Sequence, residues 1–388
     1  VRENANQKLY GRIGQLKHLY KKNKDMVIGI TGCMMQEKDE VETIQEKYPY
    51  VHLIFGTHNI YKLAELLLEA LISKERKVET WEDTGLIVEN LPSKRKYPFR
   101  ASVNISFGCN NFCTYCIVPY VRGREKSRDS REIVKECEDL VQDGVKEIML
   151  LGQNVNSYGL DREEELSFPE LLRTVAKIPG LRRIRFMTPN PKDFSDELLS
   201  VIKENENICN HIHLPLQSGS TNILKRMNRH YTKESYLSLL RKIKESLPEL
   251  GLTTDIIVGF PGETEEDFQD TLSVVREAQF DSAFTFQYSK RSGTPAAKWE
   301  AVDEKIVAER FQRLLDTIRE SSKEREGKDL GKVMEVLVEE RNTENNMLTG
   351  RLENNILVHF EGGERLLGEI VPVKLEKSMG FYYYGSVV

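Results

Sequence analysis

The sequence contains no long apolar segment. None of its 388 residues belongs to a run of 18 or more apolar residues, so the sequence predicts no membrane-spanning helix. Its first residues, Val1–Ala5, have neither the apolar core nor the cleavage site of a signal peptide. A content of 39% hydrophobic and 30% charged residues is typical of a soluble protein, and the length predicts two or three domains.

Cysteine is also scarce, and the chain has no excess of positive charge. The chain has six cysteines, three of them clustered, which favours a reducing cytoplasm over a disulfide scaffold. Its net charge of −5 argues against a strongly basic nucleic-acid binder, so any anion site must be local. Residues 93–131 are such a local exception, because nine basic and two acidic residues give them a net charge of +7. We predict substrate contacts to a phosphate backbone at Arg122, Arg124 and Arg128, whereas Lys94–Lys96 alone also fit a solvated linker.

Three cysteines, Cys109, Cys113 and Cys116, lie within eight residues with CX3CX2C spacing. Three thiolates so arranged can hold three irons of a 4Fe–4S cube and leave the fourth iron open to a small-molecule ligand. A structural zinc site usually needs a second pair of ligands at short spacing, and the nearest other cysteine, Cys137, lies in a helix-like run. The spacing therefore predicts a catalytic iron–sulfur cluster, with zinc or plain thiols as the alternative.

The CX3CX2C spacing resembles the signature of the radical S-adenosylmethionine (SAM) enzymes. Within that group, four segments resemble the methylthiotransferases: Gly108–Arg128, Leu151–Gly159, His213–Ser220 and Gly259–Thr264. Two of the sequence features, Gln153–Tyr158 and the opening Val1–Ala5, resemble the branch that modifies isopentenyladenosine in tRNA. The similarity runs nearly from end to end.

This resemblance implies a reaction. SAM would bind the cluster on Cys109, Cys113 and Cys116 and be cleaved by one electron to a 5′-deoxyadenosyl radical, which takes hydrogen from C2 of N6-isopentenyladenosine next to the anticodon. A second SAM would supply the methyl group. The candidate SAM contacts are Tyr115 and Ile117, which match positions near the adenine, and the polar residues Gln153, Asn154, Gln217 and Ser218, each of which is otherwise an ordinary turn residue. The implied partners are tRNA and an electron-donor protein such as flavodoxin or ferredoxin, with no membrane and no DNA.

The resemblance also implies a second, auxiliary 4Fe–4S cluster that takes part in supplying sulfur. Cys33 matches its third ligand position, although a lone cysteine after a strand is more often a buried apolar thiol. The other two ligands are expected upstream, one of them immediately before a run like Val1–Ala5, and the chain contains neither. We therefore expect an N-terminally truncated chain with an incomplete auxiliary cluster.

The hydrophobic pattern predicts an α/β fold. Six β-like runs are each followed by a helix-like segment, which predicts a parallel sheet and a partial (β/α)6 radical SAM barrel over residues 100–325. The runs are Ser102–Phe107, Glu147–Leu151, Arg182–Met187, His211–Leu216, Thr253–Val258 and Ala283–Tyr288. The loops after parallel strands form the active face of such folds, and all of the distinctive motifs fall in those loops.

Two smaller domains flank this barrel. Residues 1–92 predict an N-terminal α/β methylthiotransferase domain, separated from the barrel by a charged linker at Pro92–Pro98. Residues 326–388 contain five β-like runs, which predict a small β-barrel that resembles the RNA-binding TRAM domain. Seven basic and eleven acidic residues give this segment a net charge of −4, so phosphate attraction is not its whole function.

Other interpretations remain open. His211 and His213 alternate along a predicted strand, where a packing role is favoured over metal binding. The nearer alternative is a methylthiotransferase that acts on threonylcarbamoyl-adenosine tRNA or on a ribosomal protein. A non-catalytic iron–sulfur protein that binds RNA is the alternative from another class.

Overall fold

The computed structural model describes residues 3–80, 86–89, 91, 93–323, 327–343 and 345–388. Val1 and Arg2 of the opening motif, Pro92 of the predicted linker and the domain boundary at 324–326 lie outside the described residues. The chain divides into two compact units. The first unit comprises residues 1–93, 107–126 and 289–298, and the second comprises 94–106, 127–288 and 299–388. The predicted cysteine loop thus belongs to the same unit as the N-terminal residues.

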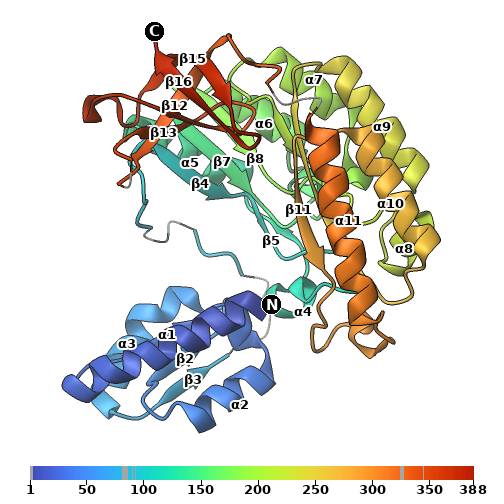
Figure 1. Cartoon of the computed structure of the whole chain (residues 1–388). Helices are drawn as coiled ribbons and strands as arrows, with labels where there is room; N and C mark the ends of the chain where they lie inside the picture. The colour runs from blue at the N-terminus through green and yellow to red at the C-terminus, as the bar shows by residue number, and fades with distance from the viewer. Residues whose placement is uncertain (1–2, 81–85, 90, 92, 324–326, 344) are drawn as a thin grey trace. The chain divides into compact units, whose positions relative to one another are not determined.

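The N-terminal part of the first unit is a small α/β sheet with helices around it (Figure 1). Its strands β1 (Gly29–Thr31), β2 (Leu53–Phe55) and β3 (Lys77–Glu79) are parallel and lie in that order. Its helices are α1 (Glu3–Lys22), η1 (Cys33–Gln36), α2 (Lys38–Lys47), η2 (Ile60–Lys62) and α3 (Leu63–Ser73). The buried side chains of Ile13, Ile30, Met35, Ile44 and Ile54 form its core. Two further helices of this unit are α4 (Val118–Arg122), which follows the cysteine loop, and η5 (Pro295–Lys298).

Six parallel strands form the centre of the second unit. They are β4 (Arg100–Asn104), β7 (Glu147–Leu151), β8 (Arg183–Phe186), β9 (His211–His213), β10 (Gly251–Val258) and β11 (Ser282–Gln287). They form the sheets β4-β7-β8 and β9-β10-β11, and a parallel bridge between Ile184 and Ile208 lies where the two sheets adjoin. A short two-stranded sheet of β5 (Ser106–Phe107) and β6 (Lys126–Ser127) lies at the base of the cysteine loop. The predicted partial (β/α)6 barrel is confirmed.

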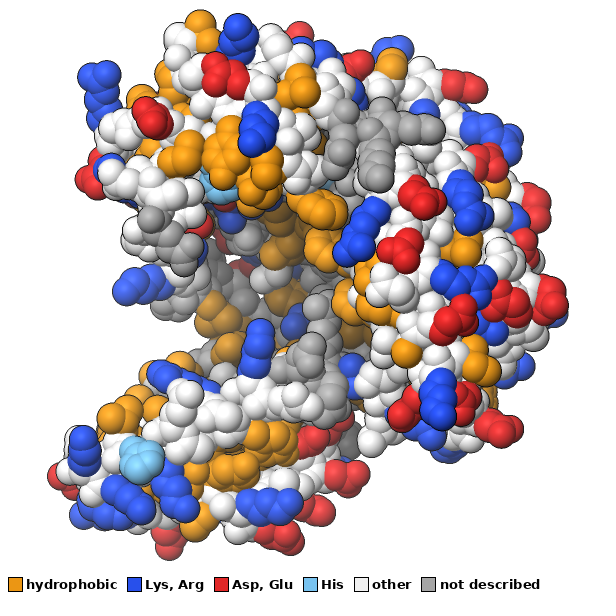
Figure 2. Space-filling view, in the orientation of Figure 1, with side chains coloured by type: hydrophobic (Ala, Val, Ile, Leu, Met, Phe, Trp, Pro, Cys, Tyr) orange, Lys and Arg blue, Asp and Glu red, His pale blue; other side chains and the backbone are white. Residues whose placement is uncertain are grey.

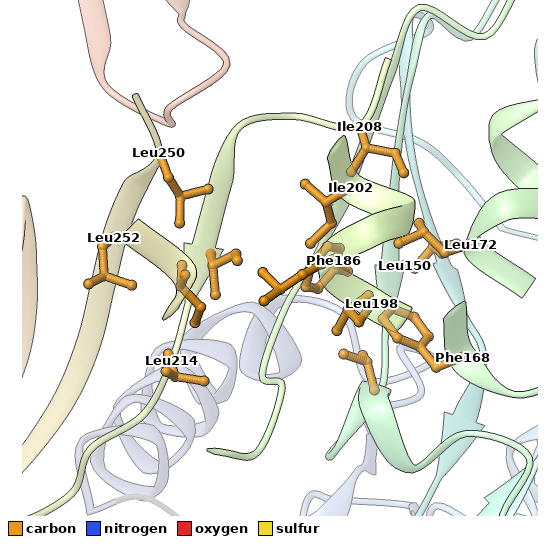
Figure 3. Packing of buried hydrophobic residues seen from close by; sticks show 14 of the residues in the cluster. Leu150, Phe168, Leu172, Phe186, Leu198, Ile202, Ile208, Leu214, Leu250 and Leu252 are labelled. Atoms are coloured by element: carbon orange, nitrogen blue, oxygen red, sulfur yellow. The ribbon is translucent and has the colours of Figure 1, made fainter. Parts of the chain in front are cut away.

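Helices cover one face of these strands. They are α5 (Ser130–Gln142), α6 (Phe168–Ala176), α7 (Asp196–Glu204), α8 (Thr221–Arg226), α9 (Lys233–Ser246), α10 (Glu265–Ala278) and α11 (Glu304–Lys323). Figure 3 shows the core between strands and helices, where Leu150 and Phe186 lie beside Phe168, Leu172 and Leu198. No helix in the described part of the chain combines the length and the hydropathy that crossing a bilayer requires.

The C-terminal segment is a closed five-stranded barrel. Its strands are β12 (Val333–Arg341), β13 (Leu348–Arg351), β14 (Leu357–Phe360), β15 (Ile370–Ser378) and β16 (Tyr382–Val387), in the order β12-β13-β14-β16-β15. Side chains alternate between the two sides of a strand, so Tyr383 lies inside at 4% exposure. Tyr382 and Tyr384 stand on the other side of β16, with ring centroids 5.0 and 5.9 Å from the ring of His359.

Two buried arginines of β8 join this C-terminal barrel to the six parallel strands. Arg183 donates to the carbonyls of Arg351 and Glu335 at 2.9 and 2.8 Å. Arg185 donates to the carbonyls of Glu353 and Leu352, both at 2.8 Å. Its Nε also lies 3.0 Å from the carboxylate of Glu147, which begins β7 and is fully buried. The C-terminal barrel therefore packs against the ends at which β7 and β8 begin.

Candidate active site

The three clustered cysteines lie in one loop between β5 and α4. The base of the loop is closed by the Cys109 amide, which donates to the Gly123 carbonyl at 3.2 Å. A tight turn brings the Cys116 amide to 2.9 Å from the Cys113 carbonyl, and the Asn111 amide group lies 3.4 Å from Cys109 Sγ. Burial raises the pKa of the Cys109 thiol, and the Cys113 side chain is also buried. All six cysteines are described, and none forms a disulfide.

The first unit brings Cys33 to this loop. Arg122, the last residue of α4, donates from Nε to Cys33 Sγ at 3.0 Å. The hydroxyl of Thr57 also donates to the carbonyl of Val121 at 3.3 Å, which ties the same helix to the chain after β2. The Arg122 guanidinium thus contacts the thiol of Cys33, the residue predicted as a ligand of the auxiliary cluster. The contact of Arg122 with substrate stays a prediction.

The donor types of the loop fit an iron–sulfur cluster. Three thiols in one loop match the CX3CX2C ligand set of a 4Fe–4S cube with one open iron. Among the described residues, no three cysteine, histidine or acidic side chains are already gathered around one point where a metal ion would bind. The assignment of a 4Fe–4S cluster to this loop therefore depends on the chemistry and spacing of the three thiols. Cys33 by itself would not hold the auxiliary cluster that the family resemblance implies, because one thiol does not hold a cube.

The two remaining arginines of the basic region differ in burial. Arg124 is exposed, and its guanidinium lies 5.2 Å from the centre of the Phe112 ring. Arg128 is buried in the second unit, where its guanidinium lies 2.8 Å from the Glu136 carboxylate and donates to the Asn104 carbonyl at 2.6 Å. The Arg128 side chain is therefore engaged inside the protein rather than presented to a substrate.

The residues predicted to contact SAM fall into two loops of the second unit and one of the first. Gln153 is partly exposed after β7, and its neighbour Asn154 is buried. The Asn154 amide donates to the Asp193 carboxylate at 2.8 Å and accepts from the Asn190 amide at 3.2 Å. Asn154 therefore connects the loops after β7 and β8. In the first unit, Ile117 is buried and Tyr115 is partly exposed.

The loop after β9 is held against α10. The hydroxyl of Ser218 lies 3.4 Å from that of Thr271 and accepts from the Ser220 amide at 3.2 Å. A Cβ on Gly219 would lie 2.5 Å from the Thr271 backbone, so this close approach requires glycine. The Gln217 amide donates to the Asp255 carbonyl at 2.8 Å, which extends the sheet beyond β9. The Ser218 hydroxyl is thus used inside the protein, and the Gln217 side chain is buried.

Backbone strain marks these loops and was missed in the sequence. Thr188 after β8, Gln217 after β9 and Phe112 in the cysteine loop have φ values of +61°, +66° and +45°, which non-glycine residues rarely adopt. Such strain often lies at functional sites, because the surrounding structure must hold it in place. No sequence signal for it exists at a threonine, glutamine or phenylalanine.

The two histidines of β9 are buried, as the packing interpretation expected. The Nε2 of His211 and the Nδ1 of His213 lie 3.1 and 3.0 Å from the same hydroxyl, that of Thr253. Burial, with Arg185 nearby, lowers the pKa of His211 to about 3. His211 is therefore neutral at physiological pH.

Comparisons with known families agree with this architecture. Residues 103–275 match the model of the radical SAM superfamily, and residues 327–388 match that of the TRAM domain. Residues 1–56 match a family described as uncharacterized protein family UPF0004. Among solved structures, the cobalamin-dependent S-adenosylmethionine radical enzyme OxsB with aqua-cobalamin bound has a TM-score of 0.50 at 15% identity, over 81% of this chain and 46% of that one. This likeness concerns the fold alone.

Curated relatives match over the whole chain. The tRNA-2-methylthio-N(6)-dimethylallyladenosine synthase of Lachnoclostridium phytofermentans is 59% identical over 390 residues, covering 100% of this chain and 86% of the relative. Enzymes of the same name from Alkaliphilus oremlandii and Acetivibrio thermocellus are 54% and 53% identical, with 83% and 81% of their lengths covered. The chain belongs to this family of radical SAM methylthiotransferases.

Proposed function

We propose that this protein methylthiolates C2 of N6-isopentenyladenosine next to the anticodon of tRNA. The observation that carries this proposal is the match of the whole chain to synthases of this name at 50% identity and above. The relatives reported above are all named tRNA-2-methylthio-N(6)-dimethylallyladenosine synthases, which favours this substrate over threonylcarbamoyl-adenosine and a ribosomal protein. The radical SAM fold and the thiol-bearing loop favour an enzyme over a non-catalytic RNA-binding protein.

Cys109, Cys113 and Cys116 would hold the 4Fe–4S cluster. When bound, the cluster and SAM supply one-electron cleavage of the SAM sulfonium and a radical that removes hydrogen from the substrate. The protein holds the thiols in one loop and shields Cys113 from solvent, at 7% exposure. Exclusion of water and oxygen from this loop protects reactive species. Gln153, Gln217, Tyr115 and Ile117 remain our proposed contacts to SAM.

We also propose that Cys33 belongs to the auxiliary site. Its sulfur accepts a hydrogen bond from Arg122, and a cationic donor stabilises a thiolate ligand. The remaining partner that we propose is an electron-donor protein such as flavodoxin or ferredoxin. We also propose a cytoplasmic location, because the proposed substrate is tRNA. The exposed guanidinium of Arg124 is the arginine that we retain as a tRNA contact.

The test is anaerobic reconstitution of the full chain followed by reduction in the presence of SAM. We expect about four irons at the cysteine loop and release of 5′-deoxyadenosine. Cys113→Ala should abolish both, whereas Cys137→Ala, which changes a thiol buried in the hydrophobic core of the second unit, should retain both. Deoxyadenosine release by Cys113→Ala would refute the assignment of the cluster. Mass spectrometry of nucleosides from treated tRNA distinguishes isopentenyladenosine from the other substrates.

A further inference from the structure

The strands β9, β10 and β11 have one face packed against helices of the second unit and one face turned away from them. The strand register aligns Thr253 with His213 and with Ser282, and Asp255 with Phe284. Aligned residues of neighbouring strands point to the same side of a sheet, and residues two apart along a strand do so as well. The opposite side carries Ile212, Leu252, Ile256 and Val258, which belong to the core beneath the helices. His213, Asp255, Phe284 and Phe286 therefore share the face that looks away from the helices.

Two aromatic rings on this face are exposed. Phe284 and Phe286 are 53% and 41% exposed, although both lie within a strand of the central sheet. Adjacent large apolar side chains left in water mark a binding surface more often than a stabilising one. In the space-filling view of Figure 2, hydrophobic side chains gather where Figure 1 places β11.

Buried polar groups fix one of these rings in place. The ring of Phe284 meets that of His213 edge to face, with centroids 5.7 Å apart. His213 is 3% exposed and is itself held by the Thr253 hydroxyl at 3.0 Å and by the Asp255 carboxylate, 3.5 Å from its Nε2. An apolar wall beside a few fixed polar groups is the usual composition of a pocket for a largely apolar ligand.

The strand that carries the exposed rings is followed along the chain by a segment of the first unit. β11 ends at Gln287, and the chain passes directly into residues 289–298. In that segment, the Ala296 amide donates to the carbonyl of Thr114 in the cysteine loop at 2.9 Å. The strand that carries Phe284 and Phe286 therefore leads directly to a segment that contacts the cysteine loop.

We propose that Phe284 and Phe286 bind the prenylated adenine and select it over unmodified adenine. This inference rests on the proposed function. The isopentenyl group is a five-carbon apolar substituent. Its contact with the two exposed rings would remove apolar surface of the isopentenyl group and of the rings from water, which favours binding. Phosphate contacts are the same for prenylated and unmodified RNA, so they do not contribute to this preference.

The experiment measures binding of the full reconstituted chain to two RNA hairpins that differ only in the isopentenyl group on the target adenosine. The wild type should prefer the prenylated hairpin. Phe284→Ala and Phe286→Ala should each reduce this preference about tenfold, the usual effect of losing a small apolar contact, and leave the affinity for the unmodified hairpin unchanged. Phe284→Leu, which stays apolar, should retain part of the preference. The matched control is Phe381→Ala, because Phe381 is 64% exposed and lies beside β16 of the C-terminal barrel.

Three outcomes overturn the inference. They are a wild type without preference, a double variant that keeps the full preference, and an equal loss of affinity for both hairpins. Both rings are exposed, so the variants should fold, and unchanged thermal unfolding checks this. The proposed function fails separately, when the reduced wild type releases no 5′-deoxyadenosine from SAM in the absence of RNA.

Discussion

At the scale of single residues, burial separates arginines that the charge pattern groups together. Arg124 is exposed, whereas the Arg128 side chain is 8% exposed and paired with Glu136. A phosphate contact by Arg128 would require breaking this pair and the bond to the Asn104 carbonyl. A basic run in a sequence does not reveal which of its members point inward.

This difference predicts two distinct phenotypes. Arg128→Ala should lower the free energy of unfolding by about 2–4 kcal/mol, because a buried ion pair and hydrogen bond are lost, and should leave the salt dependence of tRNA binding unchanged. Arg124→Ala should leave stability unchanged and reduce the slope of affinity against salt by about one unit. Urea denaturation measures the free energy of unfolding, and tRNA binding at several salt concentrations measures the slope of affinity against salt. Arg131→Ala is the control for stability, since its side chain is 89% exposed. A fully stable Arg128→Ala protein with a reduced slope would contradict this division.

His211 makes stability depend on pH. Burial lowers its pKa from 6.5 to about 3, so the unfolded chain takes up a proton as the pH falls below 6.5 while the folded chain does not. The folded state therefore loses stability from pH 6.5 down to about pH 3. At about pH 5 the expected loss is about 2 kcal/mol relative to neutral pH. The test is to measure the free energy of unfolding of the wild type and of His211→Gln at about pH 5 and at neutral pH. The variant has no imidazole at this position, so its stability should lack the loss that protonation of His211 in the unfolded chain causes. Equal pH dependence in the two proteins would contradict it.

At the scale of elements, the geometry of the cysteine loop depends on a backbone contact at its base. Gly108 has a φ of +70°, and a Cβ on it would lie 2.1 Å from the Arg124 carbonyl oxygen. Gly108→Ala should therefore force the two legs of the loop apart and lower the iron bound per chain, while the barrel stays folded. Iron analysis and circular dichroism measure the two effects.

The control for this prediction is Gly14→Ala, which adds a methyl group in α1 with no atom within 4 Å. It should bind iron normally and gain about 0.5–1 kcal/mol of stability, because alanine favours a helix over glycine. Normal iron binding by Gly108→Ala would show that the loop tolerates a wider base.

The elements predicted best from sequence are those with strong local signals. The helix-like segments expected after His211–Leu216 and Thr253–Val258 are confirmed by α9 and α10, whose first turns are capped by the side chains of Thr232 and Thr264. The three-residue strand β3 was missed, because Lys77–Glu79 contains a single apolar side chain, that of Val78, which is too little to make a periodic pattern. The six-residue helix α8 was missed as well, since it is too short for a periodic pattern.

In the candidate site too, features with a local sequence signal could be predicted and features without one could not. The spacing of Cys109, Cys113 and Cys116 is a local pattern, so the sequence alone indicates the ligand set. The hydrogen bond from Arg122 to Cys33 joins residues 89 positions apart, and the positive φ of Thr188 results from tertiary packing. Neither leaves a trace in local composition, so the sequence alone does not reveal them.

At the scale of the whole molecule, Arg183 and Arg185 make the C-terminal barrel part of the second unit. Arg185→Ala would leave the fully buried Glu147 carboxylate without its counter-charge, which should cost about 3–5 kcal/mol. Amide hydrogens of β12–β16 should then exchange faster than in the wild type. Arg182→Ala is the matched control, because its side chain is 58% exposed and 3.8 Å from Glu335, and its effect should stay within about 0.5 kcal/mol. Unchanged exchange in Arg185→Ala would show that other contacts hold the barrel.

This attachment also sets a minimum length for any RNA that contacts both the C-terminal barrel and the loops of the candidate site in the second unit. The C-terminal barrel is fixed where β7 and β8 begin, whereas these loops follow the opposite ends of the parallel strands. β10 has eight residues, so at roughly 3.3 Å per residue it separates its two ends by about 26 Å. An RNA that contacts both ends must span at least this length. A free nucleoside is too short to do so, so it would contact one end at most, whereas a folded RNA hairpin is long enough to contact both.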